Sequence, residues 1–232
     1  EFSHVSVTTI GDSAPAFDIG DSNTNFSFNH ITVVTKDAES SGFEIGDDNS
    51  NFSFDEISIT TYDNNSLGFD IENNNGNFTF DNMVVETFGS NSSAFQIEDG
   101  NSDFAFTNMS LSTGEGSAKG FDINNGNSDF SFADIMVQTY DSSSQAFDIE
   151  YGNNTFSSAN LEIQTDDNGS DAFEINDNNS SFTFTGLTLN TDDSSAHGFD
   201  INDGNSDFSF NQISFLGDDG SEAWEINDGN MD

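Results

Sequence analysis

Carboxylate and amide side chains recur in this sequence at spacings that could gather a hard cation. Four turns place oxygen donors at alternate positions: Asp21-x-Asn23-x-Asn25, Asp47-x-Asn49-x-Asn51, Asp99-x-Asn101-x-Asp103 and Asp203-x-Asn205-x-Asp207. Calcium loops begin in this way, but the bidentate glutamate that closes an EF-hand loop is missing. Asx residues also favour turns without any ion. We therefore expect these turns either to bind Ca²⁺ along one edge or to be plain solvated turns.

A second set of carboxylates recurs once in every repeat of the sequence, with a final step that is one residue shorter. Its members are Asp18, Glu44, Asp70, Gln96, Asp122, Asp148, Glu174, Asp200 and Glu225, of which all but Gln96 are acidic. Equal charges about 4.8 Å apart repel by about 1 kcal/mol in water, and by more at a lower effective dielectric constant. The column therefore requires screening, raised pKa values or bound cations.

The rest of the composition excludes several kinds of chemistry. Cysteine is absent, so disulfides, thiolate metal sites and cysteine nucleophiles are ruled out. A net charge of −41 argues against nucleic-acid binding and against docking on anionic membranes, and no apolar run is long enough to insert in a bilayer. We interpret Lys36 and Lys119 as isolated surface charges. His4 and His30 share a column and could hold a metal, although plain surface positions are the simpler interpretation.

Enzyme activity is not expected from this sequence. An active site departs locally from a repeat, whereas the acids here recur almost uniformly. Carboxylate pairs suited to glycoside hydrolysis are nevertheless plentiful, which keeps a β-helix carbohydrate-active enzyme as the third alternative. A complete threonine column from Thr9 to Thr191 raises the alternative of an ice-binding face, but it has no consistent threonine column beside it.

The elements that must carry these side chains follow from one strict repeat. An aromatic anchor falls at Phe17, Phe43, Phe69, Phe95, Phe121, Phe147, Phe173 and Phe199, every 26 residues, and Trp224 follows one residue early. Within the unit 16–41, apolar residues alternate with polar ones in three short stretches, which predicts three short strands. The unit is too short for a propeller blade of four strands.

The repeat predicts an all-β fold, a single parallel β-solenoid domain over residues 1–232 with about nine coils. Each strand then pairs with its copy one coil away, and each motif position becomes a column. An invariant asparagine column is interpreted as a structural ladder, because the amide offers both a donor and an acceptor. It runs through Asn23, Asn49, Asn75, Asn101, Asn127, Asn153, Asn179, Asn205 and Asn230.

The two ends of the sequence resemble its interior. No polar or helical cap is visible, and the terminal segments keep the inward pattern of the other units. Matching open ends form a heterologous contact, which propagates into a filament. The residues expected at this contact are Phe2, Val5, Val7, Trp224, Ile226 and Asn230.

Over its whole length the chain resembles extracellular parallel β-solenoid proteins of the adhesin and filament-forming kind. The resemblance is carried by the strict repeat pattern rather than by a diagnostic motif. It implies a structural role at the cell surface or outside the cell. We expect a subunit of an extracellular filament with itself as partner, no certain cofactor, and divalent cations as potential bridges between filaments. A Ca²⁺-stabilised repeat region of an adhesin is the second alternative.

Overall fold

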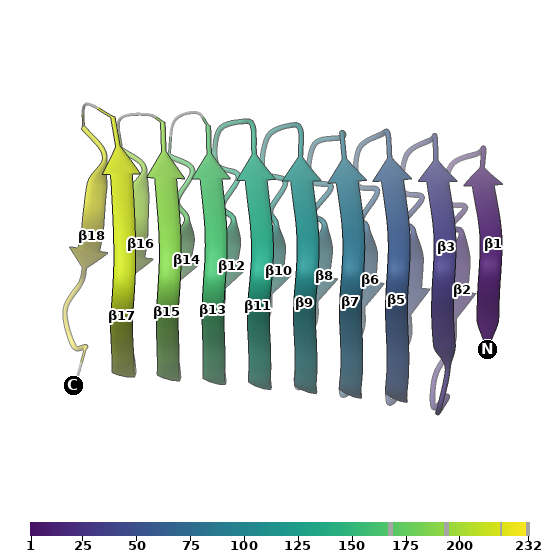
Figure 1. Cartoon of the computed structure of the whole chain (residues 1–232), viewed down its shortest axis with the longest axis horizontal. Helices are drawn as coiled ribbons and strands as arrows, with labels where there is room; N and C mark the ends of the chain where they lie inside the picture. The colour runs from purple at the N-terminus through teal and green to yellow at the C-terminus, as the bar shows by residue number, and fades with distance from the viewer. Residues whose placement is uncertain (167–168, 193–194, 219, 231–232) are drawn as a thin grey trace.

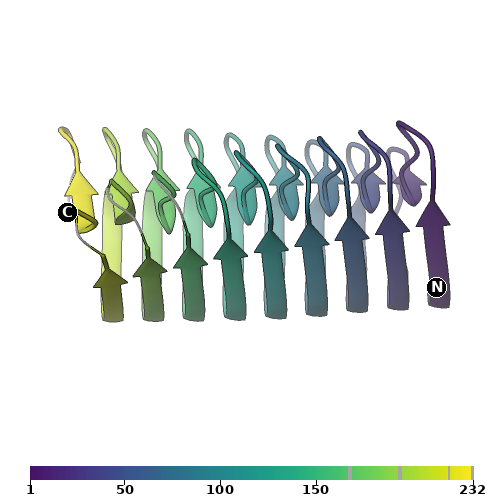
Figure 2. The same cartoon turned by 90° about the horizontal axis from the view of Figure 1, so that it is seen from above.

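The computed structural model describes residues 1–166, 169–192, 195–218 and 220–230. These residues form a parallel β-solenoid of about eight turns, with two nine-stranded sheets lying against each other. Figure 1 shows the long strands side by side, and Figure 2 shows the short strands as a second row behind them. The two chain ends lie at opposite ends of the rod. The all-β solenoid predicted from the repeat is confirmed.

Each coil contributes one long and one short strand. The long strands are β1 (Phe2–Thr9), β3 (Ser27–Thr35), β5 (Ser50–Thr61), β7 (Gly76–Thr87), β9 (Ser102–Thr113), β11 (Ser128–Thr139), β13 (Asn154–Thr165), β15 (Ser180–Thr191) and β17 (Ser206–Gly217). The short strands are β2 (Phe17–Ile19), β4 (Phe43–Ile45), β6 (Phe69–Ile71), β8 (Phe95–Ile97), β10 (Phe121–Ile123), β12 (Phe147–Ile149), β14 (Phe173–Ile175), β16 (His197–Ile201) and β18 (Glu222–Ile226). No described helix is long and apolar enough to cross a membrane.

Paired residues in neighbouring strands are offset by one sequence repeat. Phe43 pairs with Phe69 and Phe54 with Phe80, so each residue pairs with its copy one repeat along the chain. The last step, from Phe199 to Trp224, is one residue shorter, as the early tryptophan requires. A constant register places every motif position directly above its copy, so that the columns predicted from the sequence exist in the structure.

The structure has two strands per coil where three were expected. The second and third predicted strands are joined into one long strand by a single left-handed residue, Glu56 in β5, with φ of 53°. In a regular strand Phe54 and Ile57 would point to opposite faces. The left-handed residue between them shifts the alternation of inward and outward side chains, so that both are buried. The chain turns at that point, but hydrogen bonds to the next coil continue on both sides. The corner therefore does not end the strand.

Left-handed corners explain much of the polar composition. The coil 30–55 has positive φ at His30, Glu39, Asp48 and Asn51, and neighbouring coils repeat these positions. A left-handed conformation costs most L-residues about 1–2 kcal/mol, while glycine, asparagine and aspartate adopt it more readily. The Asx-rich and Gly-rich turns are thus a requirement of the backbone path, whether or not an ion binds there.

The core is a set of stacked aromatic and aliphatic columns. Phe43 and Phe69 stack with ring centroids 4.8 Å apart, and Phe54 meets Phe69 edge-on at 5.3 Å. Met83 and Met109 are buried within it, as core-filling residues should be. The threonine column also points inward, with Thr35 and Thr61 fully buried. Its described members from Thr35 to Thr191 therefore cannot form an outer ice-binding face.

Candidate functional site

The asparagine column forms the expected ladder, with a different set of bonds. Asn49 is 1% exposed, and its Oδ1 accepts a hydrogen bond of 2.7 Å from the backbone N–H of Asn23. Its Nδ2 donates to the backbone carbonyl of Gly46 at 2.7 Å. The ladder thus joins side chain to backbone between coils, rather than amide to amide. The same inter-coil bond involves Asn75, Asn101, Asn127, Asn153, Asn179, Asn205 and Asn230.

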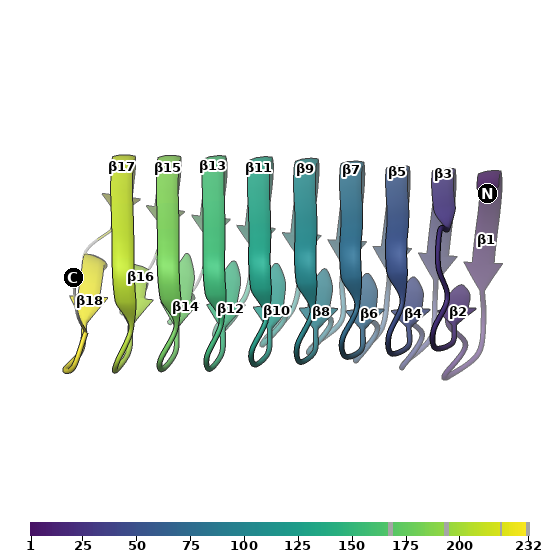
Figure 3. The ribbon, with the colours of Figure 1, turned by 90° about the horizontal axis from the view of Figure 1, so that it is seen from below.

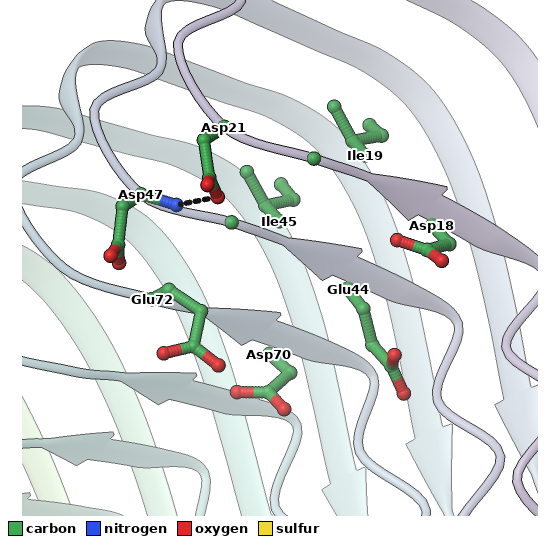
Figure 4. Close-up of a pocket in the computed structure, with 10 residues that line it drawn as sticks. Asp18, Ile19, Asp21, Glu44, Ile45, Asp47, Asp70 and Glu72 are labelled. Atoms are coloured by element: carbon green, nitrogen blue, oxygen red, sulfur yellow. Dashed lines mark hydrogen bonds between the residues drawn. The ribbon is translucent and has the colours of Figure 1, made fainter.

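The first residue of the predicted calcium turn also bonds to the adjacent coil. Asp21 Oδ1 accepts from the backbone N–H of Asp47 at 3.0 Å, the dashed contact in Figure 4. Asp47 Oδ1 accepts in turn from Asn73, and Asp99 Oδ1 from the backbone N–H of Asn125. In the last of the four turns, Asp203 uses its backbone N–H to donate to the preceding coil.

The third residue of each turn is a left-handed corner. The φ values are 63° at Asn25, 58° at Asn51, 59° at Asp103 and 58° at Asp207. The three predicted ligands of one turn therefore have distinct structural tasks: an inter-coil acceptor, a buried ladder residue and a corner. Calcium binding at these turns stays a prediction.

The outward residues of the short strands bring the second set of carboxylates together. We call the column Asp18, Glu44, Asp70, Gln96, Asp122, Asp148, Glu174, Asp200 and Glu225 the acidic strip. Its members pair one above the other along the short sheet, for example Glu44 with Asp70 and Asp122 with Asp148. Figure 3 shows the short strands in a continuous row along the rod. The strip is the feature of this surface with the clearest electrostatic consequence.

A residue three positions before a strip member reaches the carboxylate of the next coil. Lys119 Nζ lies 3.0 Å from Asp122 Oδ1 and also contacts Asp148 Oδ2. Gln145 donates from Nε2 to Glu174 Oε2 at 2.7 Å, and His197 Nε2 lies 3.0 Å from Glu225 Oε2. Bridging across coils is thus a repeated geometry of the strip.

The interpretation of Lys119 as an isolated surface charge is wrong. Its side chain is 19% exposed and bridges two carboxylates. Burial opposes the charged ammonium, but the adjacent Asp122 and Asp148 outweigh it and hold the pKa of Lys119 above its usual range. The spacing in the sequence could have indicated this bridge. Lys119 stands shortly before Asp122, and it precedes Asp148, the next acid of the column, by little more than one repeat. Lys36, in contrast, is exposed as expected.

Near the first coils the described residues form no such bridge on the strip. Figure 4 shows the carboxylates of Glu44, Asp70 and Glu72 on the outer side of the ribbon. With Asp18, Asp21 and Asp47, they line a hollow of about 270 Å³ in which no lining residue carries a positive charge. Burial, followed by repulsion from Glu72, Glu44 and Glu98, raises the pKa of Asp70 to about 7. Burial and the nearby acids also raise the pKa of Glu44. The carboxylates of this segment are therefore protonated more easily than exposed ones.

The two end coils expose residues that are buried elsewhere in the same columns. Phe2 is 40% exposed, whereas Phe28, the next residue of its column, is 1% exposed. Phe210 is 36% exposed, Trp224 37% and Ile226 59%. Val5 and Val7 are half-buried, and Asn230 accepts the last bond of the asparagine ladder from Asn205 at 2.8 Å. All six predicted contact residues therefore lie in the end coils.

Comparisons with known proteins do not assign the chain to a family. No protein-family model matches the chain, and no curated protein matches it. Among solved structures, it is similar to a family 28 exopolygalacturonase of Yersinia enterocolitica at 13% identity. The alignment covers 86% of this chain and 46% of that chain, with a TM-score of 0.24. At that score the similarity carries no argument about activity.

Proposed function

We propose that the chain is a structural subunit of an extracellular filament, in which a second copy continues the solenoid head to tail. The observation that supports this proposal is the constant register, which carries the same columns from the first described coil to the last. Phe2 and Phe210 belong to one column and are both more than one third exposed. Phe17 and Trp224 belong to another column, so a second copy would place like rings upon like.

The physical gain from such a contact comes from rings and backbone together. Within the chain, Trp224 stacks on Phe199 at 4.5 Å and Phe2 on Phe28 at 5.0 Å. Fully burying one large apolar side chain stabilises a contact by about 1.5–3 kcal/mol. In the described chain, β1 pairs with β3 and β18 with β16, which leaves one edge of each end strand open to further pairing.

The lateral surface fits the same proposal. A net charge of −41 distributed along a rod repels neighbouring rods. Growth is then favoured along the axis, where like apolar columns meet, and opposed at the sides. Divalent cations would reduce this repulsion and bring filaments together.

A pair of end variants tests the proposal. Phe2→Asp damages one end and Trp224→Glu the other, so each variant alone should stay monomeric in light scattering at concentrations where the unmodified chain forms filaments. Mixed together, they should form dimers and stop there, because one undamaged head meets one undamaged tail. Tyr140→Glu is the control, since Tyr140 is 46% exposed on the side of the rod. Monodisperse short rods of the unmodified chain at every concentration would contradict the proposal.

A Ca²⁺-stabilised repeat region of an adhesin is the second candidate. The unbridged carboxylates around the hollow of Asp18, Glu44 and Asp70 favour it, because a bound cation would remove their repulsion. Calcium should then raise the melting temperature of the chain, and less so in a Glu44→Gln variant. An unchanged melting temperature in millimolar Ca²⁺ would eliminate this candidate.

A further inference from the structure

Three potential metal ligands meet near the end of the rod, where a histidine lies beside the acidic strip. Asp171, His197 and Asp200 each offer a ligand atom, and these atoms all lie within 4.8 Å of one another. Asp171 precedes β14, and the other two belong to β16, so adjacent coils form the cluster. Asp171 Oδ1 lies 3.0 Å from His197 Nδ1 and accepts from its backbone N–H. The ligand atoms are thus held by two paired coils rather than by a loose loop.

One carboxylate oxygen of the cluster is buried without a described partner. Asp200 Oδ1 is buried and has no hydrogen-bond partner among the described residues. Asp171 is only 6% exposed, and Glu225 Oε2 lies 3.0 Å from His197 Nε2. Three carboxylates therefore surround one imidazole, and even a protonated histidine leaves negative charge in a partly buried place. Buried carboxylates of this kind are paired with a cation, neutralised by protonation or coordinated to a metal.

The equivalent place in the middle of the rod holds a cation. Lys119 stands three residues before Asp122 and contacts Asp148 of the next coil. His197 stands three residues before Asp200 and contacts Glu225 of the next coil, so the two side chains occupy the same position of the repeat. An ammonium neutralises the strip at the first position. At the second, an imidazole stands in the same place, between Asp171 and Glu225.

We propose that Asp171, His197 and Asp200 bind a divalent transition-metal ion, with Zn²⁺ as the best match. Imidazole nitrogen with carboxylate oxygens suits Zn²⁺ and its neighbours, whereas Ca²⁺ and Mg²⁺ take oxygen ligands. Two ligands at about 2.0 Å from a tetrahedral ion stand about 3.3 Å apart, close to the separation of Asp171 Oδ1 from His197 Nδ1.

In this arrangement Glu225 is a positioning residue. The metal takes Nδ1 on the side of Asp171, and His197 Nε2–H donates to the Glu225 carboxylate, 3.0 Å away. A carboxylate at the second ring nitrogen fixes the tautomer and orientation of a metal-bound histidine, and its loss lowers metal affinity by about 10–100-fold. Water completes the coordination sphere of the ion.

Calorimetric titration of the whole chain with ZnCl₂ tests the assignment. The expected result is one strong site, weakened at least about tenfold in His197→Gln and in Asp200→Asn. His30→Gln is the matched control, because His30 also contacts a carboxylate, that of Glu56, but is about half exposed and outside the described three-ligand cluster. Its affinity for zinc should not change.

Cobalt and calcium titrations decide between the possible outcomes. Co²⁺ should give the visible absorption of a tetrahedral nitrogen and oxygen site in the unmodified chain, and lose it in Asp200→Asn, which preserves the shape of the side chain. Equal binding of Zn²⁺ in the unmodified chain and in both cluster variants would overturn the proposal. So would Ca²⁺ competing equally well with Zn²⁺, since that result indicates an oxygen-only strip.

Discussion

The middle of the acidic strip and its beginning share one backbone and differ in charge. Around β10 and β12, Lys119 bridges Asp122 and Asp148. Around β4 and β6, Ser41 and Leu67 occupy the position of Lys119, and no cation is among the described residues that line the hollow of Glu44 and Asp70. The strands pair in the same register in both places, each residue with its copy in the next repeat. The fold therefore sets where the carboxylates stand, and one side chain decides how their charge is compensated.

The comparison shows two ways of tolerating stacked acids. Beside Lys119, burial raises the pKa of Asp122 while the ammonium lowers it. At Asp70, burial and three nearby acids all act in one direction, and the pKa rises to about 7. A carboxylate of the first kind can stay ionised in a stable coil. One of the second kind is stable mainly when protonated or when a cation binds.

Removing the bridge should have the largest effect. Lys119→Met keeps the apolar stem of the side chain but leaves Asp122 and Asp148 unpaired in a partly buried site. Loss of one partner from a buried ion pair costs about 3–5 kcal/mol. We expect the free energy of unfolding at pH 8, measured with urea, to fall by about 3 kcal/mol.

The exposed lysine supplies the control for this variant. Lys36→Met removes the same charge from an exposed position and should change the free energy of unfolding by less than about 0.5 kcal/mol. A Lys119→Met, Asp122→Asn, Asp148→Asn triple variant should recover most of the loss, since no unpaired charge remains. Equal effects of the two lysine variants would show that the bridge does not stabilise the rod.

The sequence predicts the columns well because they depend on one strict periodicity. The regularly spaced aromatic anchors give the register, the buried phenylalanine columns and the asparagine ladder before any coordinates are known. The alternation of apolar and polar residues did not predict that a single left-handed residue such as Glu56 bends a strand without ending it. The strand continues because its residues form hydrogen bonds with another coil on both sides of the bend. The local pattern of apolar and polar residues carries no information about those bonds.

The strip shows the same limit at the level of chemistry. A column of acids is visible in the sequence, and so is the need to neutralise it. Which acids are neutralised depends on contacts between side chains of adjacent coils, such as Lys119 with Asp148 and His197 with Glu225. Lys119 and His197 take their roles from the position that they share within the repeat, and residue type alone does not reveal it.

Acidity should stabilise the beginning of the strip. Between the unfolded pKa of Asp70, 3.8, and its folded value of about 7, the folded chain binds more protons than the unfolded chain. Its stability must then fall as pH rises through this window, and the loss is complete above about pH 7. Asp70→Asn removes the penalty, so we expect a gain of about 2 kcal/mol at pH 8 and little gain at pH 4.

Melting curves of the variant and the unmodified chain at both pH values provide the measurement. Asp129→Asn is the control, because Asp129 is an exposed left-handed corner and asparagine adopts that conformation equally well. It removes one negative charge without touching the strip. If Asp129→Asn and Asp70→Asn stabilise the chain equally at pH 8, overall charge rather than the hollow is responsible.

The smallest expected effect is the most direct test of the comparison, because it builds the bridge where it is missing. Ser41 precedes Gly42-Phe43-Glu44 as Lys119 precedes Gly120-Phe121-Asp122, and it stands as far before Asp70 as Lys119 stands before Asp148. Ser41→Lys should therefore contact Glu44 and Asp70 together.

Such a bridge would act on the pKa of Asp70 before it acts on stability. A nearby ammonium favours the ionised carboxylate, so the pKa of Asp70 should fall, which NMR of the side-chain carboxyl can follow. Desolvation of the new lysine offsets much of the Coulombic gain, which leaves about 1 kcal/mol of added stability at pH 8. Ser41→Met gives the same stem without the charge and should leave the pKa of Asp70 unchanged or higher. If both variants move that pKa alike, the difference between the two regions arises from packing, and a single cation in the repeat does not account for it.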